Sequence, residues 1–468
     1  MTEDGQRFSI AIIGGGIAGA CLAGGLARHP GIKIDIYEAT EAFAEIGAGI
    51  SVWKRTLDLL KKLGMEEHFM KISTFPKKDA ANLAFHFRKS DQEHGQTFHT
   101  WELEGGMTTF HRAQFLDALV KALPAGCAHF EKKCVSYNQD QSQGLVSIQF
   151  EDGTTAVADA VIACDGIGSV IRGQMYREEA KKHSDDSFLE YVHPIWSGRL
   201  AYRVVFPSAK LKEVSPSHRN LTTPHMYCGK NAHILAYPVI QGTAIGLVAY
   251  NSDFTKEGTS LVKADLPIPS REDLKSHYAG WEQDVQDILE KCAGSPPRWA
   301  VLSLKPLPFY VRDRVALFGD AAHATTPHQG SGAGLGVEDA FMLSRLLGDP
   351  SVNKQNLPIA LLAYERARLP RTHHVMKGSR QCGFIFEFNG APGDNLELVG
   401  REIEVLTEWI TTTDPEEDVA SALSWMKEQQ SLAKVWTGTK FYDQQEVGGN
   451  ILGFDPITMG LGWWLWLL

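Results

Sequence analysis

One glycine-rich segment near the N-terminus constrains the fold of this chain more than any other feature. Residues 10–19 read Ile-Ala-Ile-Ile-Gly-Gly-Gly-Ile-Ala-Gly, in which Gly14, Gly16 and Gly19 fit the pattern G-x-G-x-x-G. An apolar run precedes the glycines, and a helical stretch and a second apolar strand follow them. This order of strand, glycine turn, helix and strand predicts a Rossmann-type βαβ unit.

Each glycine of such a unit has a separate role: a tight turn, close approach of the backbone to a pyrophosphate, and close packing of helix on strand. The helix N-terminus adds unpaired N–H groups and a partial positive charge, which favour a bound phosphate. Glu38 follows Gly19 at the distance expected of an acid that meets a ribose hydroxyl. The segment predicts a dinucleotide site; the alternative is a glycine-rich turn in an ordinary α/β domain.

Two further motifs place glycine and aspartate after apolar strands. Residues 160–163 lead into Asp165-Gly166, and residues 315–318 lead into Gly319-Asp320. A glycine-rich helix start follows the second motif, and glycine costs about 0.5–1 kcal/mol relative to alanine within a helix. We therefore expect this backbone to approach another group closely, with packing alone as the alternative. The glycines concerned are Gly330, Gly332, Gly334 and Gly336.

The middle and the end of the chain have different patterns. Residues 198–206, 233–240 and 244–250 predict strands of an antiparallel sheet in a second domain. After residue 357 the chain becomes mostly helical, and its first helix is expected to end before Pro370. The tryptophan-rich residues 463–468 predict a tail that packs on the protein, or alternatively a contact with a membrane or a second copy.

Composition bounds the class of protein. A chain of 468 residues exceeds one hydrophobic core, so two or three domains are expected. A net charge of −10 argues against nucleic-acid binding, and no apolar run is long enough to predict a transmembrane span. Seven scattered cysteines without a C-x-x-C pair predict a reducing, cytoplasmic compartment and no metal site.

The three motifs together, in this order and spacing, resemble the group A FAD-dependent aromatic hydroxylases, such as para-hydroxybenzoate and salicylate hydroxylases. The resemblance covers roughly residues 8–380 and is greatest to fungal salicylate-hydroxylase-like and phenol-dearomatising enzymes. It implies an α/β fold in which a Rossmann-type FAD-binding domain is interleaved with a β-sheet substrate domain, before a helical C-terminal region. The expected boundaries are 1–75, 107–182 and 300–356 for the first domain, 76–106 and 183–299 for the second, and 357–468 for the last.

The resemblance also implies FAD as cofactor and NADH or NADPH as co-substrate, without a separate domain for the nicotinamide. It assigns the glycine motif to the pyrophosphate of FAD, Arg112 and Asp320 to its phosphate and ribityl region, and Asp165 to FAD and NAD(P)H binding. The residues expected to bind the cofactor are Gly14, Gly16, Gly19, Glu38, Arg112, Asp165, Asp320, Pro327, Gly330, Gly332, Ala333 and Gly334.

The implied reaction is hydroxylation of a phenol. In the family NAD(P)H reduces FAD, O2 adds to give a flavin C4a-hydroperoxide, and the distal hydroxyl passes to an electron-rich ring carbon. Because the pKa of a phenol lies near 10, a fixed cation is the simplest means of ionising the substrate. Arg203 lies in an otherwise apolar strand, and alternation puts Arg199 on the same face and Tyr202 on the other.

Arg203 and Tyr237 look like the arginine and tyrosine that hold the phenolate in dearomatising relatives, so both are predicted catalytic residues. The alternatives are a structural salt bridge for Arg203 and a core hydroxyl for Tyr237. His323 and His328 flank the third motif. We expect turn histidines hydrogen-bonded to the backbone rather than general bases.

Three functions remain open at this point. The first is hydroxylation of a small aromatic phenol, with or without decarboxylation or dearomatisation. The second is epoxidation or Baeyer–Villiger oxidation of a non-aromatic substrate. The third is a low-turnover flavin-binding sensor or scaffold. The expected partners are a phenolic substrate, O2 and NAD(P)H, in a monomer or homodimer, and the sequence does not identify the phenol.

Overall fold

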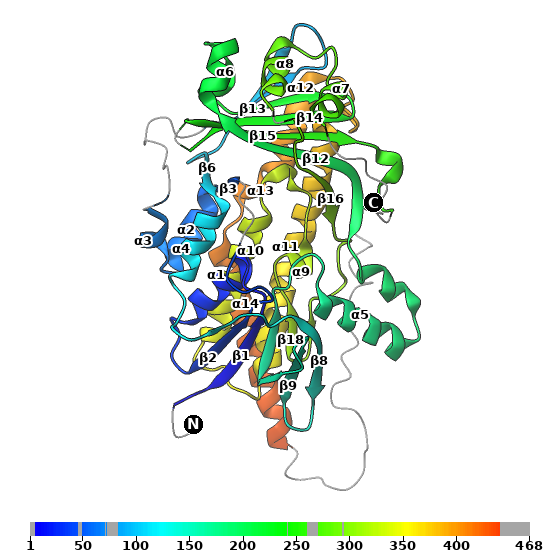
Figure 1. The fold of residues 1–468 in the computed structure, drawn as a ribbon. Helices are drawn as coiled ribbons and strands as arrows, with labels where there is room; N and C mark the ends of the chain where they lie inside the picture. The colour runs from blue at the N-terminus through cyan, green and yellow to red at the C-terminus, as the bar shows by residue number, and fades with distance from the viewer. Residues whose placement is uncertain are drawn as a thin grey trace.

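A computed structural model describes residues 5–44, 49–70, 72, 83–240, 242–259, 270–292 and 294–439 (Figure 1). Two large β-sheets lie toward opposite ends of the molecule. The long helix α11 (Leu357–Phe386) starts in the core of the lower sheet and ends in the apolar cluster beneath the upper one. The predicted α/β class is confirmed, including the helical C-terminal region, while the domain boundaries stay a prediction.

The lower sheet is the Rossmann-type sheet. Strand β1 pairs in parallel with β2 on one side and with β11 on the other, and β11 pairs in parallel with β18. The two strands that precede the glycine–aspartate motifs therefore lie beside each other and close to the first strand. In spatial order the sheet consists of β17 (Val311–Arg312), β18 (Val315–Leu317), β11 (Ala160–Ala163), β1 (Phe8–Ile13), β2 (Ile32–Tyr37) and β7 (Ala128–His129).

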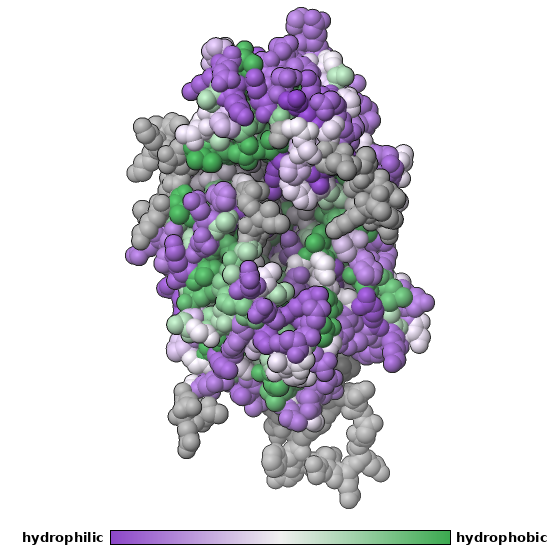
Figure 2. Space-filling view, in the orientation of Figure 1, coloured by the Kyte–Doolittle hydropathy of each residue, from purple (hydrophilic) through white to green (hydrophobic). Residues whose placement is uncertain are grey.

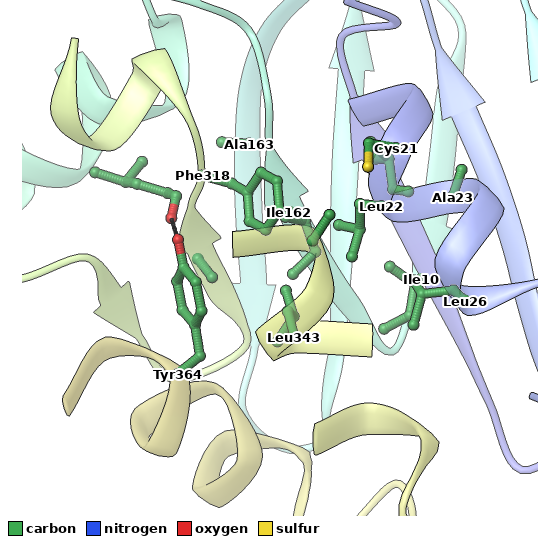
Figure 3. Close-up of a cluster of buried hydrophobic side chains, with 14 of the residues drawn as sticks. Ile10, Cys21, Leu22, Ala23, Leu26, Ile162, Ala163, Phe318, Leu343 and Tyr364 are labelled. Carbon is green, nitrogen blue, oxygen red and sulfur yellow. Dashed lines mark hydrogen bonds between the residues drawn. The ribbon is translucent and has the colours of Figure 1, made fainter. Parts of the chain in front are cut away.

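Helices cover this sheet because its central strands are apolar on both faces. All four residues of β11 and five of the six of β1 are buried. Figure 3 shows Ile10 and Ile162 of these strands against Leu22 and Leu26 of α1 (Ile17–Leu26). Leu343 of α10 (Gly332–Gly348) lies nearby. Tyr364 closes this core, since its buried hydroxyl donates to the carbonyl oxygen of Leu317 at 3.2 Å.

The upper sheet is antiparallel apart from one pair, β13 with β4. The three strands predicted in the middle of the chain are confirmed as β12, β14 and β15. In spatial order the sheet consists of β16 (Arg298–Ser303), β12 (Ile195–Pro207), β15 (Ala244–Ser252), β14 (Ala232–Val239), β13 (His225–Gly229), β4 (Leu83–Lys89) and β5 (Gln96–Glu102).

Smaller elements complete the fold. Two further sheets contain β10 (Thr155–Ala158), β9 (Leu145–Phe150) and β8 (Cys134–Asp140), and β3 (Gly49–Trp53) with β6 (Met107–His111). The remaining α-helices are α2 (Lys54–Lys62), α3 (Glu66–Met70), α4 (Arg112–Val120), α5 (Val170–His183), α6 (Ser208–Val214), α7 (Arg271–Ser276), α8 (Gln283–Glu290), α9 (Asp320–His323), α10 (Gly332–Gly348), α12 (Leu396–Thr407), α13 (Trp409–Thr412) and α14 (Pro415–Thr439).

The expectation that the first C-terminal helix ends before Pro370 is wrong, because α11 continues through it to Phe386. A proline inside a helix removes one backbone hydrogen bond. Burial on both sides of Pro370 offsets this loss: Arg368 is fully paired with carboxylates, and the hydroxyl of Thr372 donates to the carbonyl oxygen of Arg368 at 2.9 Å.

Several other expectations concern the chain as a whole. The tryptophan-rich residues 463–468 lie outside the described residues. Within the described part of the chain, no helix combines the length and the apolar character needed to cross a bilayer. All seven cysteines are free thiols. In the same described part, no three His, Cys, Asp or Glu side chains gather closely enough to hold a metal.

We expect Leu343→Ala to lower the free energy of unfolding by about 2–5 kcal/mol, because it opens a cavity in the core between α10 and the lower sheet. The matched control is Leu432→Ala, at a leucine that is 50% exposed, which should change stability by at most about 0.5 kcal/mol. Chemical unfolding of the purified variants measures both. Equal losses for the two leucines would contradict this account of the core.

Candidate active site

A cavity of about 440 Å³ lies between the two large sheets. Its lower end is lined by the glycine-rich turns of the Rossmann-type sheet, and its upper end by side chains of β12, β14 and β15. Figure 2 shows a largely hydrophilic face with a strip of hydrophobic residues where the upper sheet meets the rest of the molecule. The cavity thus joins the dinucleotide motif to the second sheet.

The three glycines of the first motif serve three different needs. Gly14 has φ +104°, and a side chain there would overlap the backbone of Cys164. A side chain at Gly19 would overlap the carbonyl oxygen of Gly14, so this glycine lets α1 pack against the turn. Gly16 lines the cavity, and a Cβ atom there would meet no atom within 4 Å. The fold itself requires Gly14 and Gly19, whereas Gly16 borders open space.

Two carboxylates of the predicted site bind the backbone instead of lining the cavity. Glu38 Oε2 accepts from the N–H of Gly15 at 2.7 Å, which holds the end of β2 against the glycine turn. Asp165 Oδ2 accepts from the N–H of Val170 at 2.8 Å, at the start of α5. Asp165 Oδ1 is buried without a hydrogen-bond partner, and burial raises the pKa of this carboxyl.

The third motif lies opposite the first. Gly319 has φ +57°, and α10 approaches α1 so closely that a Cβ atom on Gly336 would lie 3.1 Å from Ala18 Cβ. A Cβ atom on Gly334 would lie 2.8 Å from Thr56 Oγ1, so this glycine faces α2 and not the cavity. Packing thus accounts for Gly334 and Gly336. The predicted cofactor-binding residues that line the cavity are Gly16, Arg112, Asp320, Pro327, Gly330, Gly332 and Ala333.

A buried charge network supports the third motif. In α10, Asp339 accepts hydrogen bonds from the N–H of Gly319 at 3.2 Å and from Nε2 of His323 at 2.6 Å. Arg368 of α11 pairs with Asp339 at 2.6 Å and with the neighbouring Glu338 at 2.8 Å. Burial alone would raise the pKa of Asp339, but His323 and Arg368 together lower it to about 2. The prediction of a backbone partner for His323 is therefore wrong.

These features fit the diphosphate and sugar chain of FAD. Gly16 is the N-cap of helix α1, and no side chain caps the helix. Since the first turn also contains no acidic residue, its N–H groups remain available to a phosphate. The open space at Gly16 and the unpartnered oxygen of Asp165 lie at the same end of the molecule. Metal ligation has no comparable support among the described residues.

The upper end of the cavity contains a cation without an acidic partner. Arg203 of β12 lines the cavity, and its guanidinium lies 5.8 Å from the ring centre of Trp299, a side chain that is 46% exposed. Among the described residues no carboxylate pairs with Arg203. The alternative of a structural salt bridge thus has no support in the described part of the chain.

Strand alternation places the two arginines of β12 as predicted. Arg203 lies opposite Val248 of β15, which also lines the cavity. Arg199 lies on the same face but does not line the cavity, because its guanidinium is buried against the stacked rings of Phe254 and Phe384. Tyr202 points to the other face and donates to Asp273 at 2.6 Å.

Tyr237 of β14 also lines the cavity. Its ring packs over Gly246 of the neighbouring strand, where a Cβ atom would lie 3.2 Å from the ring. Burial raises the pKa of Tyr237, and Arg203 opposes part of this rise. The hydroxyl therefore stays protonated near neutral pH and can donate a hydrogen bond.

Two polar side chains that line the cavity, His233 and Tyr250, were not predicted as site residues from the sequence. His233 lies two and four residues before Leu235 and Tyr237 on the same strand, so alternation from Tyr237 would have found it. Tyr250 stacks on His233 with ring centres 4.4 Å apart. No pattern in the sequence reveals the apolar wall, which comes from distant segments: Trp53, Phe85, Trp101, Met107, Met226 and Phe386.

His328 of the short 3-10 helix η5 (Pro327–Gln329) lines the cavity as well. Neither of its ring nitrogens has a hydrogen-bond partner, so the predicted backbone bond is wrong here too. Burial, then the positive charge of Arg199, lowers the pKa of His328 well below its usual value. It is a neutral imidazole whose ring forms part of the cavity wall, while both of its nitrogens are buried.

Comparisons with known proteins agree with this geometry. The profile of a family described as FAD binding domain matches residues 7–191 and 307–379. The chain is 35% identical to a salicylate hydroxylase of Pseudomonas putida over 92% of this chain and 98% of the relative. It is 32% identical to a 6-methylsalicylate 1-monooxygenase of Aspergillus terreus over 92% and 95%. A solved salicylate hydroxylase substrate complex aligns with TM-score 0.79 and 30% identity over 89% of this chain and 98% of that one.

We expect Gly16→Val to purify as folded protein with little bound FAD, because its side chain fills the open space beside the N-terminus of α1. The affinity should fall at least roughly tenfold, about 1.4 kcal/mol. Flavin absorbance per polypeptide and the thermal midpoint of the apoprotein measure the two effects.

The matched control is Gly294→Val, at an exposed glycine that also has no atom within 4 Å of its missing Cβ. This variant should keep its flavin. Stoichiometric FAD in Gly16→Val would remove Gly16 from the site.

Proposed function

Because the chain belongs to the FAD-dependent monooxygenases that include salicylate hydroxylase, we propose that it uses NAD(P)H and O2 to hydroxylate a phenolic substrate. In the balanced reaction, the phenol, O2, NAD(P)H and one proton give the hydroxylated phenol, water and NAD(P)+. When bound, FAD supplies the electron transfer and oxygen activation that no amino-acid side chain provides. Everything else falls to the residues of the cavity.

The first requirement is an ionised phenol held in place. Arg203 supplies a permanent positive charge that has no carboxylate partner among the described residues. An opposite charge within 4–6 Å lowers the pKa of an acid by about 1–3 units, so this guanidinium favours a bound phenolate. This cation, at the upper end of the cavity and with no carboxylate partner among the described residues, is the single observation that carries the proposal.

A second group orients the anion. Tyr237 lines the cavity with Arg203, and its hydroxyl has no hydrogen bond to a described residue. Since its raised pKa keeps it protonated, it can donate to the phenolate oxygen. Two donors on one face of the sheet, from β12 and β14 on either side of β15, would fix the position of the substrate ring.

The third requirement is exclusion of water from the reacting atoms. Aromatic and methionine side chains of the upper sheet and α11, such as Trp101, Met226 and Phe386, form the wall of the cavity. A dry cavity also strengthens the interaction of Arg203 with an anion, since the effective dielectric is lower than in water.

The substrate class follows from the same cavity and from two relatives named for salicylate and 6-methylsalicylate. His328 and His233 are polar groups in addition to Arg203 and Tyr237. Of these, His233 is available to a second hydroxyl of the ring, so we propose hydroxybenzoates, with and without a second hydroxyl, as the first class to test. Hydroxylation at the carboxylate-bearing carbon would release CO2, which product analysis detects.

We expect Arg203→Ala to retain FAD but to form product roughly 10²–10³-fold more slowly. NAD(P)H oxidation should become uncoupled and yield hydrogen peroxide, because the neutral phenol is a poor nucleophile. Product and peroxide formed per NAD(P)H measure this partition.

Arg401→Ala is the matched control, because Arg401 is exposed and, among the described residues, pairs with Glu397 alone, one helical turn away. It should couple NAD(P)H oxidation to product as the wild type does. Full coupling in Arg203→Ala would exclude Arg203 from substrate ionisation.

We also expect hydroxybenzoates and simple phenols to accelerate NAD(P)H oxidation by the wild type, with one oxygen atom of ¹⁸O2 in the product. Stopped-flow mixing and mass spectrometry test both points. Turnover of alkenes or cyclic ketones, with no response to any phenol, would favour epoxidation or Baeyer–Villiger chemistry instead.

A further inference from the structure

A buried polar cluster holds His233 from behind the wall of the cavity, and the proposed function gives its charged members no role. Glu387, fully buried, follows the last residue of α11. Its Oε1 atom accepts hydrogen bonds from Nδ1 of His233 at 2.7 Å and from the hydroxyl of Ser252 at 2.9 Å. Arg199 Nε lies 3.9 Å from the same oxygen. We call these four residues the Glu387 cluster.

The cluster fixes which nitrogen of His233 carries the proton. Oε1 of Glu387 accepts from the Ser252 hydroxyl and faces the guanidinium of Arg199, so donors already surround this oxygen. Because this oxygen is the acceptor from Ser252, Nδ1 of His233 is the donor of the 2.7 Å bond to it. In the neutral imidazole the other nitrogen, Nε2, then has no proton and is an acceptor.

The ring of His233 is also held in place. It stacks on Tyr250 with an interplanar angle of 12°, and Phe386 contacts it with ring centres 5.7 Å apart. Burial lowers the pKa of His233, and Glu387 opposes this effect. The imidazole is therefore neutral near pH 7, and it lines the cavity.

The cluster is not arranged for stability alone. Nε and Nη2 of Arg199 and Oε2 of Glu387 are buried without hydrogen-bond partners. Unpartnered buried polar atoms are costly, and apolar side chains of similar volume often replace buried ion pairs without loss of stability. A role at the cavity explains why charges are placed here.

We propose that Glu387 is a positioning residue that holds His233 in the tautomer whose Nε2 accepts a hydrogen bond from a hydroxyl of the substrate. This inference rests on the proposed function. Ser252 and Arg199 hold the carboxylate in place, and Arg203 of β12 and Tyr237 of β14 hold the phenolate oxygen from either side of β15.

Glu387→Gln tests the proposal, because glutamine keeps the size of the side chain and removes its charge. With FAD bound, coupled product formation should fall about 10–100-fold, as when a partner that orients a histidine is removed elsewhere. Loss of the charge also lowers the pKa of His233 further. The acidic limb of the profile of kcat/KM against pH should therefore move to lower pH, by about one unit.

The groups that face His233 must be controlled in this profile. They are Glu387 after α11, Arg199 of β12, Tyr250 of β15 and His328 of η5. Glu397→Gln, at an exposed carboxylate, is the matched control and should leave the profile unchanged. Unchanged coupling and an unmoved acidic limb in Glu387→Gln would overturn the proposal.

Two further variants separate positioning from a structural role. In a His233→Asn background, Glu387→Gln should add no further loss, because the histidine through which it acts is absent. Ser252→Ala removes a donor to the same oxygen, which makes Glu387 a stronger acceptor, and should move the acidic limb to higher pH. An additive loss in the double variant, or a shift to lower pH in Ser252→Ala, would indicate a structural role only.

A measurement that needs no turnover distinguishes this inference from the proposed function. ¹⁵N spectra of histidine-labelled protein, with His233→Asn used to assign the signal, report the tautomer directly. We expect protonated Nδ1 and unprotonated Nε2 in the wild type. The opposite tautomer would overturn the inference even if phenols are hydroxylated. Failure of every phenol to be oxidised, with the expected tautomer present, would overturn the proposed function alone.

Discussion

The rest of the structure depends on the buried ion pairs that Arg368 of α11 forms with Glu338 and Asp339, two adjacent carboxylates of α10. Removing one partner from a buried ion pair typically costs about 3–5 kcal/mol. The two carboxylates can therefore stay buried only while Arg368 of α11 pairs with them. The same carboxylates bind Arg55 of α2 and the backbone of Gly319. Three helices and the third glycine motif are therefore held in one arrangement, and the lower end of the cavity is shaped by it.

This arrangement explains how one cavity serves two different ligands. The turns that follow β1, β11 and β18 meet at one edge of the parallel sheet, because the carboxyl ends of parallel strands share an edge. The upper sheet faces this edge with Arg203, Tyr237 and His233 on a single face. An extended cofactor along the lower edge would thus present its reactive end to a small molecule bound against the upper sheet.

Local patterns in the sequence predicted the parts of the site that depend on backbone geometry. Gly14 is required by its positive φ, and Gly19 by the close contact of α1 with the turn. Both requirements select glycine at fixed positions, so the G-x-G-x-x-G spacing in the sequence reveals them. Alternation along one strand likewise placed Arg203. The partners of His323 and His328 could not be predicted, because they depend on which helices meet in space. The helix end predicted at Pro370 was wrong for a related reason: the buried contacts of α11 outweigh the local cost of a proline inside the helix.

The order of strands in the lower sheet has a consequence for how the protein is made. Strand β1 leaves the ribosome early, but β11 joins it only after β2 to β10 have been synthesised, and β18 only after the whole upper sheet. Long-range parallel pairing of this kind is slow and leaves strand edges exposed while it waits. The nascent chain must carry its unpaired apolar strands through most of translation, so chaperones that shield them should govern the yield of active protein.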